Sequence, residues 1–93
     1  MIKTFSDKRS AAIFAGIFVK GFPSDVAVRA RMRLIQIHWA SRVDDLRLPP
    51  SNHLETHKGD RQGQWSIRIN SRWRICFRFA GSDAFDVEIV DYR

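Results

Sequence analysis

The spacing of apolar positions divides the chain into two parts. Before residue 41, apolar side chains recur every three to four positions, which predicts two helices. From residue 53 onward they alternate with polar side chains, which predicts strands. The predicted strands span 53–58, 64–69, 73–79 and 85–92, and residues 1–5 form a candidate terminal strand. This order predicts one α+β domain, residues 1–93, with the N-terminal helices packed on one face of an antiparallel sheet of four to five strands.

Both predicted helices have recognisable ends. Ser6 and Asp7 are N-cap residues for the first helix, and Gly21 is its expected C-terminal stop. Ser24 is the expected N-cap of the second helix, which runs to about Ala40. One further turn is predicted at 43–46, before the prolines at 49 and 50.

The second helix is predicted to be amphipathic. Its expected buried face consists of Val28, Met32, Ile35 and Trp39. Its expected exposed face carries Arg29, Arg33 and Gln36. This exposed face is either an ordinary solvated surface or a second nucleic-acid surface. We favour the solvated surface, because amphipathic helices of soluble proteins commonly share this pattern.

Matching the apolar faces of neighbouring strands predicts their pairing. Ile69 falls opposite Trp73, with residues 70–72 as a three-residue loop. This register puts Arg68 directly opposite Arg74. Like charges in a cross-strand pair are destabilising, so we expect an anion to bind between them.

The flanking strands are matched in the same way. Pairing Phe77 with Val87 and Ile75 with Ile89 sets Arg78 opposite Asp86 and Tyr92 beside Arg72. Pairing Leu54 with Ile69 sets Glu55 beside Arg68. The predicted cluster on the polar sheet face comprises Glu55, Arg68, Arg74 and Tyr92, with His57 and Lys58 near its edge.

A simpler interpretation treats these residues as structural. Glu55 and Arg68 then form an ordinary surface ion pair, which contributes little, and Tyr92 is a packed terminal aromatic. The cluster as a whole favours anion binding, because its arginines outnumber its acid. Cys76 shares this face without a neighbouring base and is interpreted as a small space-filling residue.

Composition narrows the functional classes. The net charge is +6, and twelve of the sixteen basic residues are arginine, which grips phosphate with a planar fork. The single cysteine excludes a disulfide scaffold. His53 and His57 lie in a predicted strand, where their spacing does not converge on a metal, so no metal site is expected. The apolar run at 11–19 imitates a signal peptide but is short and lacks a cleavage site, so a buried helix is favoured.

Such a cluster is suited to cleaving RNA. A carboxylate such as Glu55 can take the proton of a ribose 2′-hydroxyl, which then attacks the adjacent phosphate. Arg68, Arg74 and Lys58 can stabilise the charge that develops on phosphorus. The step needs no metal or other cofactor, and single-stranded RNA is the natural substrate because its 2′-hydroxyl is the nucleophile.

Several stretches carry a resemblance to a known family. They are LETHKGDRQGQ at 54–64, SIRIN at 66–70, WRICF at 73–77 and VEIVDY at 87–92, with the opening MIK-x-F. In these stretches the chain resembles the HigB toxins, which are RelE-like toxins of bacterial type II toxin–antitoxin systems and include plasmid maintenance killer proteins. The resemblance covers essentially the whole chain.

The resemblance implies a fold, an activity and partners. The implied fold is the compact RelE-like microbial ribonuclease fold. The implied activity is ribosome-dependent cleavage of mRNA in the ribosomal A site, beside ribosomal RNA, in the cytoplasm and without a membrane partner. The implied partner is a HigA-type antitoxin with a helix-turn-helix, which represses its own operon, so that operator DNA is contacted only through the antitoxin.

The resemblance also implies roles for individual residues. Lys58 matches an RNA-contacting lysine, Arg74 an arginine at the scissile phosphate, and Asp91 with Tyr92 the C-terminal catalytic segment. Glu55 stands where some HigB toxins have a histidine and where the related YoeB toxins have a glutamate assigned as general base. The remaining residues expected to contact RNA are His57, Arg61, Arg68 and Arg72.

The chain departs from the family pattern at its last residue. The family usually ends Asp-Tyr-His, whereas Arg93 follows Tyr92 here. Histidine donates a proton near neutral pH, and arginine is a poor acid. Arg93 is therefore expected to stabilise the leaving oxyanion by its charge, with Tyr92 or His57 supplying the proton. Two alternatives stay open: an inactive RNA- or ribosome-binding module, and a protein-interaction domain whose arginines meet an acidic partner.

Overall fold

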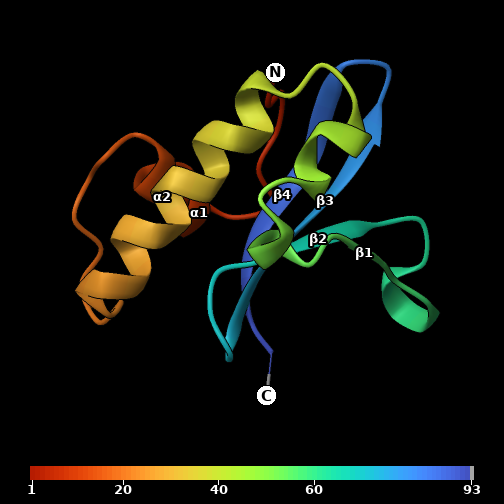
Figure 1. Cartoon of the computed structure of the whole chain (residues 1–93). Helices are drawn as coiled ribbons and strands as arrows, with labels where there is room; N and C mark the ends of the chain where they lie inside the picture. Colours follow the sequence, from red (N-terminus) through yellow and green to blue (C-terminus); the bar gives the residue numbers. More distant parts are fainter. Residues whose placement is uncertain (93) are drawn as a thin grey trace.

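Two α-helices form one layer of the structure and a four-stranded antiparallel sheet forms the other (Figure 1). The structure is a computed structural model, and it describes residues 1–92. The strands follow one another across the sheet in the order β1-β2-β3-β4. This arrangement confirms the predicted α+β class. The elements are α1 (Lys8–Phe14), α2 (Ser24–Trp39), β1 (Glu55–Thr56), β2 (Trp65–Arg68), β3 (Trp73–Ala80) and β4 (Asp83–Asp91), with 3-10 turns η1 (Val43–Arg47), η2 (Pro50–Asn52) and η3 (Gly59–Arg61).

The core lies between the helical layer and one face of the sheet. The sheet contributes alternate residues of its strands, of which Ile67, Ile75 and Phe77 are fully buried. From α2, Leu34 and Ile37 are equally buried in the same cluster. Burying each such side chain stabilises the folded state by about 1.5–3 kcal/mol. The contact between α2 and the sheet therefore holds the two layers together. Among the described residues, no helix has the length and apolar character needed to cross a bilayer.

The N-terminal segment lies along β4 without forming a regular strand. Ile2 and Phe5 make isolated parallel bridges to Ala84 and Val87. The alternating pattern at residues 1–5 therefore gives two bridges, and the described sheet has four strands.

Helix α1 is shorter than its sequence pattern predicts. Asp7 caps it as expected, since its Oδ1 accepts a hydrogen bond from the Ser10 backbone N–H at 2.7 Å. The helix ends at Phe14, well before Gly21. Gly16 adopts a left-handed φ of 80°, and Nε of Arg31 donates to the carbonyl oxygen of Phe14 at 3.1 Å. These two features end the helix and release residues 17–21 as a loop.

Helix α2 has the predicted extent but buries a different face. The buried residues are Val26, Ala30, Leu34 and Ile37. The predicted buried residues Val28, Met32 and Trp39 are exposed, and Ile35 is only partly buried. The helix carries apolar side chains on two sides, so periodicity alone could not decide between them. Its N-cap is also Pro23, without a side-chain cap bond, in place of the expected Ser24.

The central register agrees with the sequence prediction. Arg68 lies opposite Arg74 in the β2–β3 pair. Ile75 lies opposite Ile89 in the β3–β4 pair. The Tyr92 backbone N–H donates to the carbonyl oxygen of Arg72, as the predicted neighbourhood requires.

Two register predictions were wrong. A bulge between Cys76 and Arg78 sets Phe85, in place of Asp86, opposite Arg78, although the Arg78 and Asp86 side chains still pair at 3.5 Å. In the first pair, Glu55 lies opposite Ser66, and Thr56 opposite Trp65. Strand β1 has only two residues, so its pattern was too short to fix a register, and the prediction was off by two positions.

Candidate active site

A polar cleft of about 260 Å³ lies on the arginine-bearing side of the sheet. Arg68 and Arg74 alternate along their strands with Ile67 and Ile75, which belong to the core, so their side chains leave the opposite sheet face. The residues that line this polar cleft are His53, Glu55, Arg68, Asn70, Ser71, Arg74 and Tyr92. The four members of the predicted cluster therefore lie together.

Arg74 is the most buried charged residue of the polar cleft, with 8% of its surface exposed. Its Nε donates to Oγ of Ser66 at 2.8 Å, and its Nη2 donates to the carbonyl oxygens of His53 at 2.6 Å and Ser66 at 3.3 Å. Among residues 1–92, no hydrogen bond involves Nη1 of Arg74. Neutral oxygens thus fix the guanidinium group, and its ion pair with Glu55 is long, at 3.8 Å.

A hydrogen-bonded chain connects Arg74 to Tyr92. Nε2 of His57 lies 2.6 Å from Oγ of Ser66, and Nδ1 of His57 lies 2.8 Å from the hydroxyl of Tyr92. The His57 and Tyr92 rings meet edge to face at 5.6 Å. The sequence placed His57 only at the edge of the cluster, whereas the structure makes it the link between two of its members.

The donors of this chain can be assigned by accounting for protons. Arg74 has no acceptor, so Oγ of Ser66 must accept from it. The Ser66 hydroxyl is fully buried, and the contact open to its proton is Nε2 of His57. The His57 proton then lies on Nδ1 and points to Tyr92, which leaves the Tyr92 O–H free to donate into the polar cleft.

The electrostatics agree with a neutral His57. Burial, followed by the charge of Arg74, lowers the pKa of His57 below its ordinary value of 6.5, against an opposing effect of Glu55. A neutral imidazole has one donor and one acceptor, as the proton assignment requires.

Glu55 is the one carboxylate that lines the polar cleft in the described chain. Its Oε2 lies 3.8 Å from Nη2 of Arg74, and its side chain is 56% exposed. It reaches Arg74 because β1 pairs with β2 at Ser66, on which Arg74 is anchored. Its exposure leaves the carboxylate oxygens open to a ligand bound in the polar cleft.

The other arginines of the predicted cluster are held differently. Nε of Arg68 donates to the carbonyl oxygen of Asn70 at 3.0 Å, which turns its side chain toward the loop end of the polar cleft. Arg72 makes a two-pronged ion pair with Asp91, at 2.8 and 2.6 Å. This pair joins β4 to the β2–β3 loop just before Tyr92. In this structure Asp91 therefore holds the end of β4 in place.

Three further predicted residues lie away from the polar cleft or outside the described chain. Lys58 is exposed and does not line the cleft. Arg61 donates to Glu88 and to Gln64, at 3.2 and 3.1 Å. Arg93 lies outside the described residues.

Two residues of the site were missed in the sequence. Ser66 anchors both Arg74 and His57. The available signal was its position two residues before Arg68, on the same face of the strand. His53 contributes only its backbone carbonyl, in a left-handed conformation with φ of 45°, and no pattern announces such a contact. Asn52 holds this loop by donating from Nδ2 to Gln36 and to the carbonyls of Leu46 and Leu48.

Comparison with known proteins identifies the family. Residues 3–93 match the family model described as the RelE-like toxin of type II toxin–antitoxin system HigB. The chain belongs to the HigB-like toxins. The resemblance noted in the sequence is thereby confirmed, and membership of this family implies an antitoxin partner.

Individual relatives agree with this assignment. This HigB-like toxin is 35% identical over 92 residues to the protein named Endoribonuclease HigB of Proteus vulgaris, covering 99% of each chain. It is 34% identical over 72 residues to Toxin HigB-1 of Vibrio cholerae serotype O1, covering 76% of this chain and 75% of that protein. Its fold is similar to that of YafQ from E. coli strain BL21(DE3), with a TM-score of 0.57, 13% identity, and coverage of 98% of this chain and 91% of YafQ.

Proposed function

We propose that this HigB-like toxin is a ribosome-dependent endoribonuclease that cleaves mRNA in the ribosomal A site and so inhibits translation. The observation that carries the proposal is the buried Arg74, whose guanidinium group is held by neutral oxygens and lies 3.8 Å from the exposed carboxylate of Glu55. The name of the Proteus vulgaris relative, Endoribonuclease HigB, supports the same reaction class.

In the first half of the proposed reaction, Glu55 removes the proton of the ribose 2′-hydroxyl. The 2′-oxygen then forms a bond to the adjacent phosphorus. Arg74 stabilises the negative charge that develops on the phosphoryl oxygens, with Arg68 and Lys58 adding positive charge around the substrate. This chemistry uses no metal ion, because the nucleophile belongs to the substrate.

In the second half, the bond between phosphorus and the 5′-oxygen breaks. Tyr92 gives its hydroxyl proton to that oxygen, because the chain through His57 and Ser66 leaves this proton free. The N–H of His57 stabilises the resulting phenolate, which then regains a proton from water. Arg93 adds a positive charge near the leaving group. The products are a 2′,3′-cyclic phosphate and a 5′-hydroxyl, and Glu55 returns its proton to water.

The remaining residues position this machinery or contact RNA. The Arg72–Asp91 pair fixes the end of β4, from which Tyr92 enters the polar cleft. Arg61 and Lys58 follow β1 and contact the RNA backbone beside the reacting phosphate. The partner that neutralises the toxin is a HigA-type helix-turn-helix antitoxin, which alone touches operator DNA. The substrate places the toxin in the cytoplasm.

Cleavage in a translating extract tests the proposal. We expect Glu55→Gln to slow site-specific message cleavage by about 10²–10⁴-fold, the usual contribution of a general base. Arg74→Ala removes the main charge stabiliser and is expected to cost at least about 10²-fold. The measurement is primer extension on a defined message, which locates the cut and gives its rate.

Controls separate loss of chemistry from loss of folding. Arg78 is a β3 arginine that pairs with Asp86 and does not line the polar cleft, so Arg78→Ala should retain activity. Circular dichroism should show that all three variants are folded. Ribosome binding by the wild type without any cleavage would contradict the proposal and favour a non-catalytic RNA- or ribosome-binding module.

A further inference from the structure

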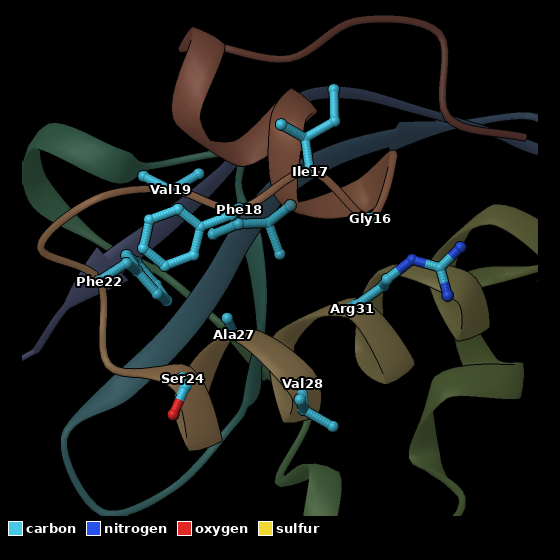
Figure 2. A pocket seen from close by; sticks show the side chains of 10 residues that line it. Gly16, Ile17, Phe18, Val19, Phe22, Ser24, Ala27, Val28 and Arg31 are labelled. Carbon is cyan, nitrogen blue, oxygen red and sulfur yellow. The ribbon is translucent and has the colours of Figure 1, made fainter.

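An apolar groove of about 280 Å³ lies in the helical layer, between the loop that follows α1 and the first turns of α2 (Figure 2). Loop residues Ile17 and Phe18 lie on one side of it, and Val28 of α2 lies on the other. Phe22 contributes to its lining as well. No residue of this apolar groove belongs to the polar cleft.

The early end of α1 creates the groove. Gly16 turns the chain with its left-handed φ, and Arg31 ties the last carbonyl of α1 to α2. The following side chains are held out in water: Ile17 is 61% exposed and Phe18 is 81% exposed. Exposed aromatic and aliphatic side chains that are adjacent in this way mark protein-binding surfaces more often than chance exposure.

The same surface continues along α2. Val28 and Met32 are 64% and 59% exposed, and Trp39 on the same helical stripe is 75% exposed. Val28, Met32 and Trp39 have the spacing of a buried helix face, yet the fold buries the opposite stripe of α2. A chain that keeps two apolar stripes on one helix has a second hydrophobic surface to cover.

The groove is bordered by positive charge. Arg31 lines it, the guanidinium group of Arg9 lies 5.1 Å from the centre of the Phe22 ring, and exposed Lys20 is in the loop. The acids near these residues in sequence are Asp7, before α1, and Asp25, in the first turn of α2, and neither lines the groove. A partner that fits this surface needs an apolar face flanked by carboxylates.

We propose that the apolar groove is the docking site of the antitoxin, and that it takes an amphipathic segment with acidic flanks. Phe18 and Val28 pack against the apolar face of that segment, and Lys20 with Arg31 meets its carboxylates. The proposal rests on membership of a toxin–antitoxin family and not on the cleavage reaction, so a toxin that failed to cut RNA would leave it standing.

Binding of the purified cognate antitoxin, measured by isothermal titration calorimetry, tests the proposal. Phe18→Glu and Val28→Glu should each weaken binding by about tenfold or more, as substitutions of central apolar contacts do. Lys20→Glu should weaken binding and reduce its dependence on salt. Leu48→Glu is the matched control: Leu48 is 71% exposed but lies outside the groove, so its dissociation constant should stay within about twofold.

Two outcomes would decide against the proposal. Unchanged antitoxin affinity in both Phe18→Glu and Val28→Glu would overturn it, provided that circular dichroism shows folded proteins. A toxin that sediments as a dimer alone, and as a monomer after Phe18→Glu, would assign the groove to a second copy of this chain. Message cleavage by Phe18→Glu should equal that of the wild type, because Phe18 does not line the polar cleft.

Discussion

At the scale of single residues, the site depends on how each polar group is satisfied. Arg74 is nearly buried, yet Ser66 and His53 bind it through neutral oxygens, so its charge remains available to a phosphate. Those bonds also determine which way the hydroxyl proton of Ser66 and the ring proton of His57 point. His57 is fixed with its acceptor toward Ser66 and its donor toward Tyr92, and its lowered pKa keeps it neutral.

The shifted pKa of His57 predicts a pH dependence of stability. The unfolded chain has the ordinary value of 6.5, whereas burial and Arg74 lower the pKa in the folded chain. Below pH 6.5 the unfolded state therefore binds more protons, and stability must fall as pH falls through the folded pKa. Urea denaturation at pH 7.5 and pH 5.5 should show a smaller loss of stability for His57→Gln than for the wild type. Equal losses would show that His57 does not titrate as described.

At the scale of elements, short irregular segments position the candidate catalytic groups that the strands carry. Turn η2 ends at Asn52, whose amide binds α2 and the preceding loop, and the next residue presents its carbonyl to Arg74. Strand β1, two residues long, places Glu55 over Ser66. The loop of residues 70–72 binds the end of β4 through Arg72 and Asp91.

Asn52 provides a test of this loop. Asn52→Ala removes three hydrogen bonds from a fully buried amide and leaves the carbonyls of Leu46 and Leu48 without that donor. We expect about 1–3 kcal/mol of lost unfolding free energy and slower cleavage, because His53 no longer holds Arg74 firmly. Thermal unfolding and the cleavage assay measure the two effects. Exposed Ser51 gives the control Ser51→Ala, and a similar loss there would argue against a specific role for Asn52.

Sequence patterns predicted those parts of the fold in which one physical signal dominates. Alternation in β2, β3 and β4 was long enough to place Arg68 opposite Arg74 and Ile75 opposite Ile89. The same rule failed for β1, which is too short, and at the bulge beside Arg78, which alternation does not encode. The buried face of α2 was missed because both of its stripes are apolar.

The candidate site was only partly predictable for a related reason. Charged side chains can be recognised from the sequence alone, so Glu55, Arg68 and Arg74 were predicted as a group. Ser66 and the carbonyl of His53 act through contacts that exist only after folding. A role for Arg93 stays a prediction, since this residue lies outside the described part of the chain.

At the scale of the whole molecule, the two layers present surfaces of different character. The sheet side presents the polar cleft with its arginines. The helical side presents the apolar groove and the bare stripe of α2. The net charge of +6 favours association with polyanions such as RNA, and the specificity of the proposed RNA binding would come from how the arginines are arranged.

Salt dependence can locate the RNA-binding surface. Affinity for single-stranded RNA should fall as salt rises, and the slope of log affinity against log salt should shrink by about 0.7 for each phosphate contact removed. We expect Arg68→Gln to reduce that slope. Arg29 is exposed on α2, and Arg29→Gln should leave the slope unchanged if the helical arginines are only solvated. Fluorescence anisotropy measures both, and an equal reduction by Arg29→Gln would make the helix a second nucleic-acid surface.

The single cysteine lies where its reactivity can report on transient opening of the sheet. Cys76 is fully buried beside Arg74, opposite Ser66 in β2 and Glu88 in β4, and burial raises the pKa of its thiol. The thiol therefore reacts with an alkylating reagent only when the central strands part. The rate at which this thiol is modified therefore measures how often the strands that carry the proposed site open. Comparing the modification rate of the free toxin with the rates in the presence of antitoxin and of ribosomes tests whether either one stiffens these strands.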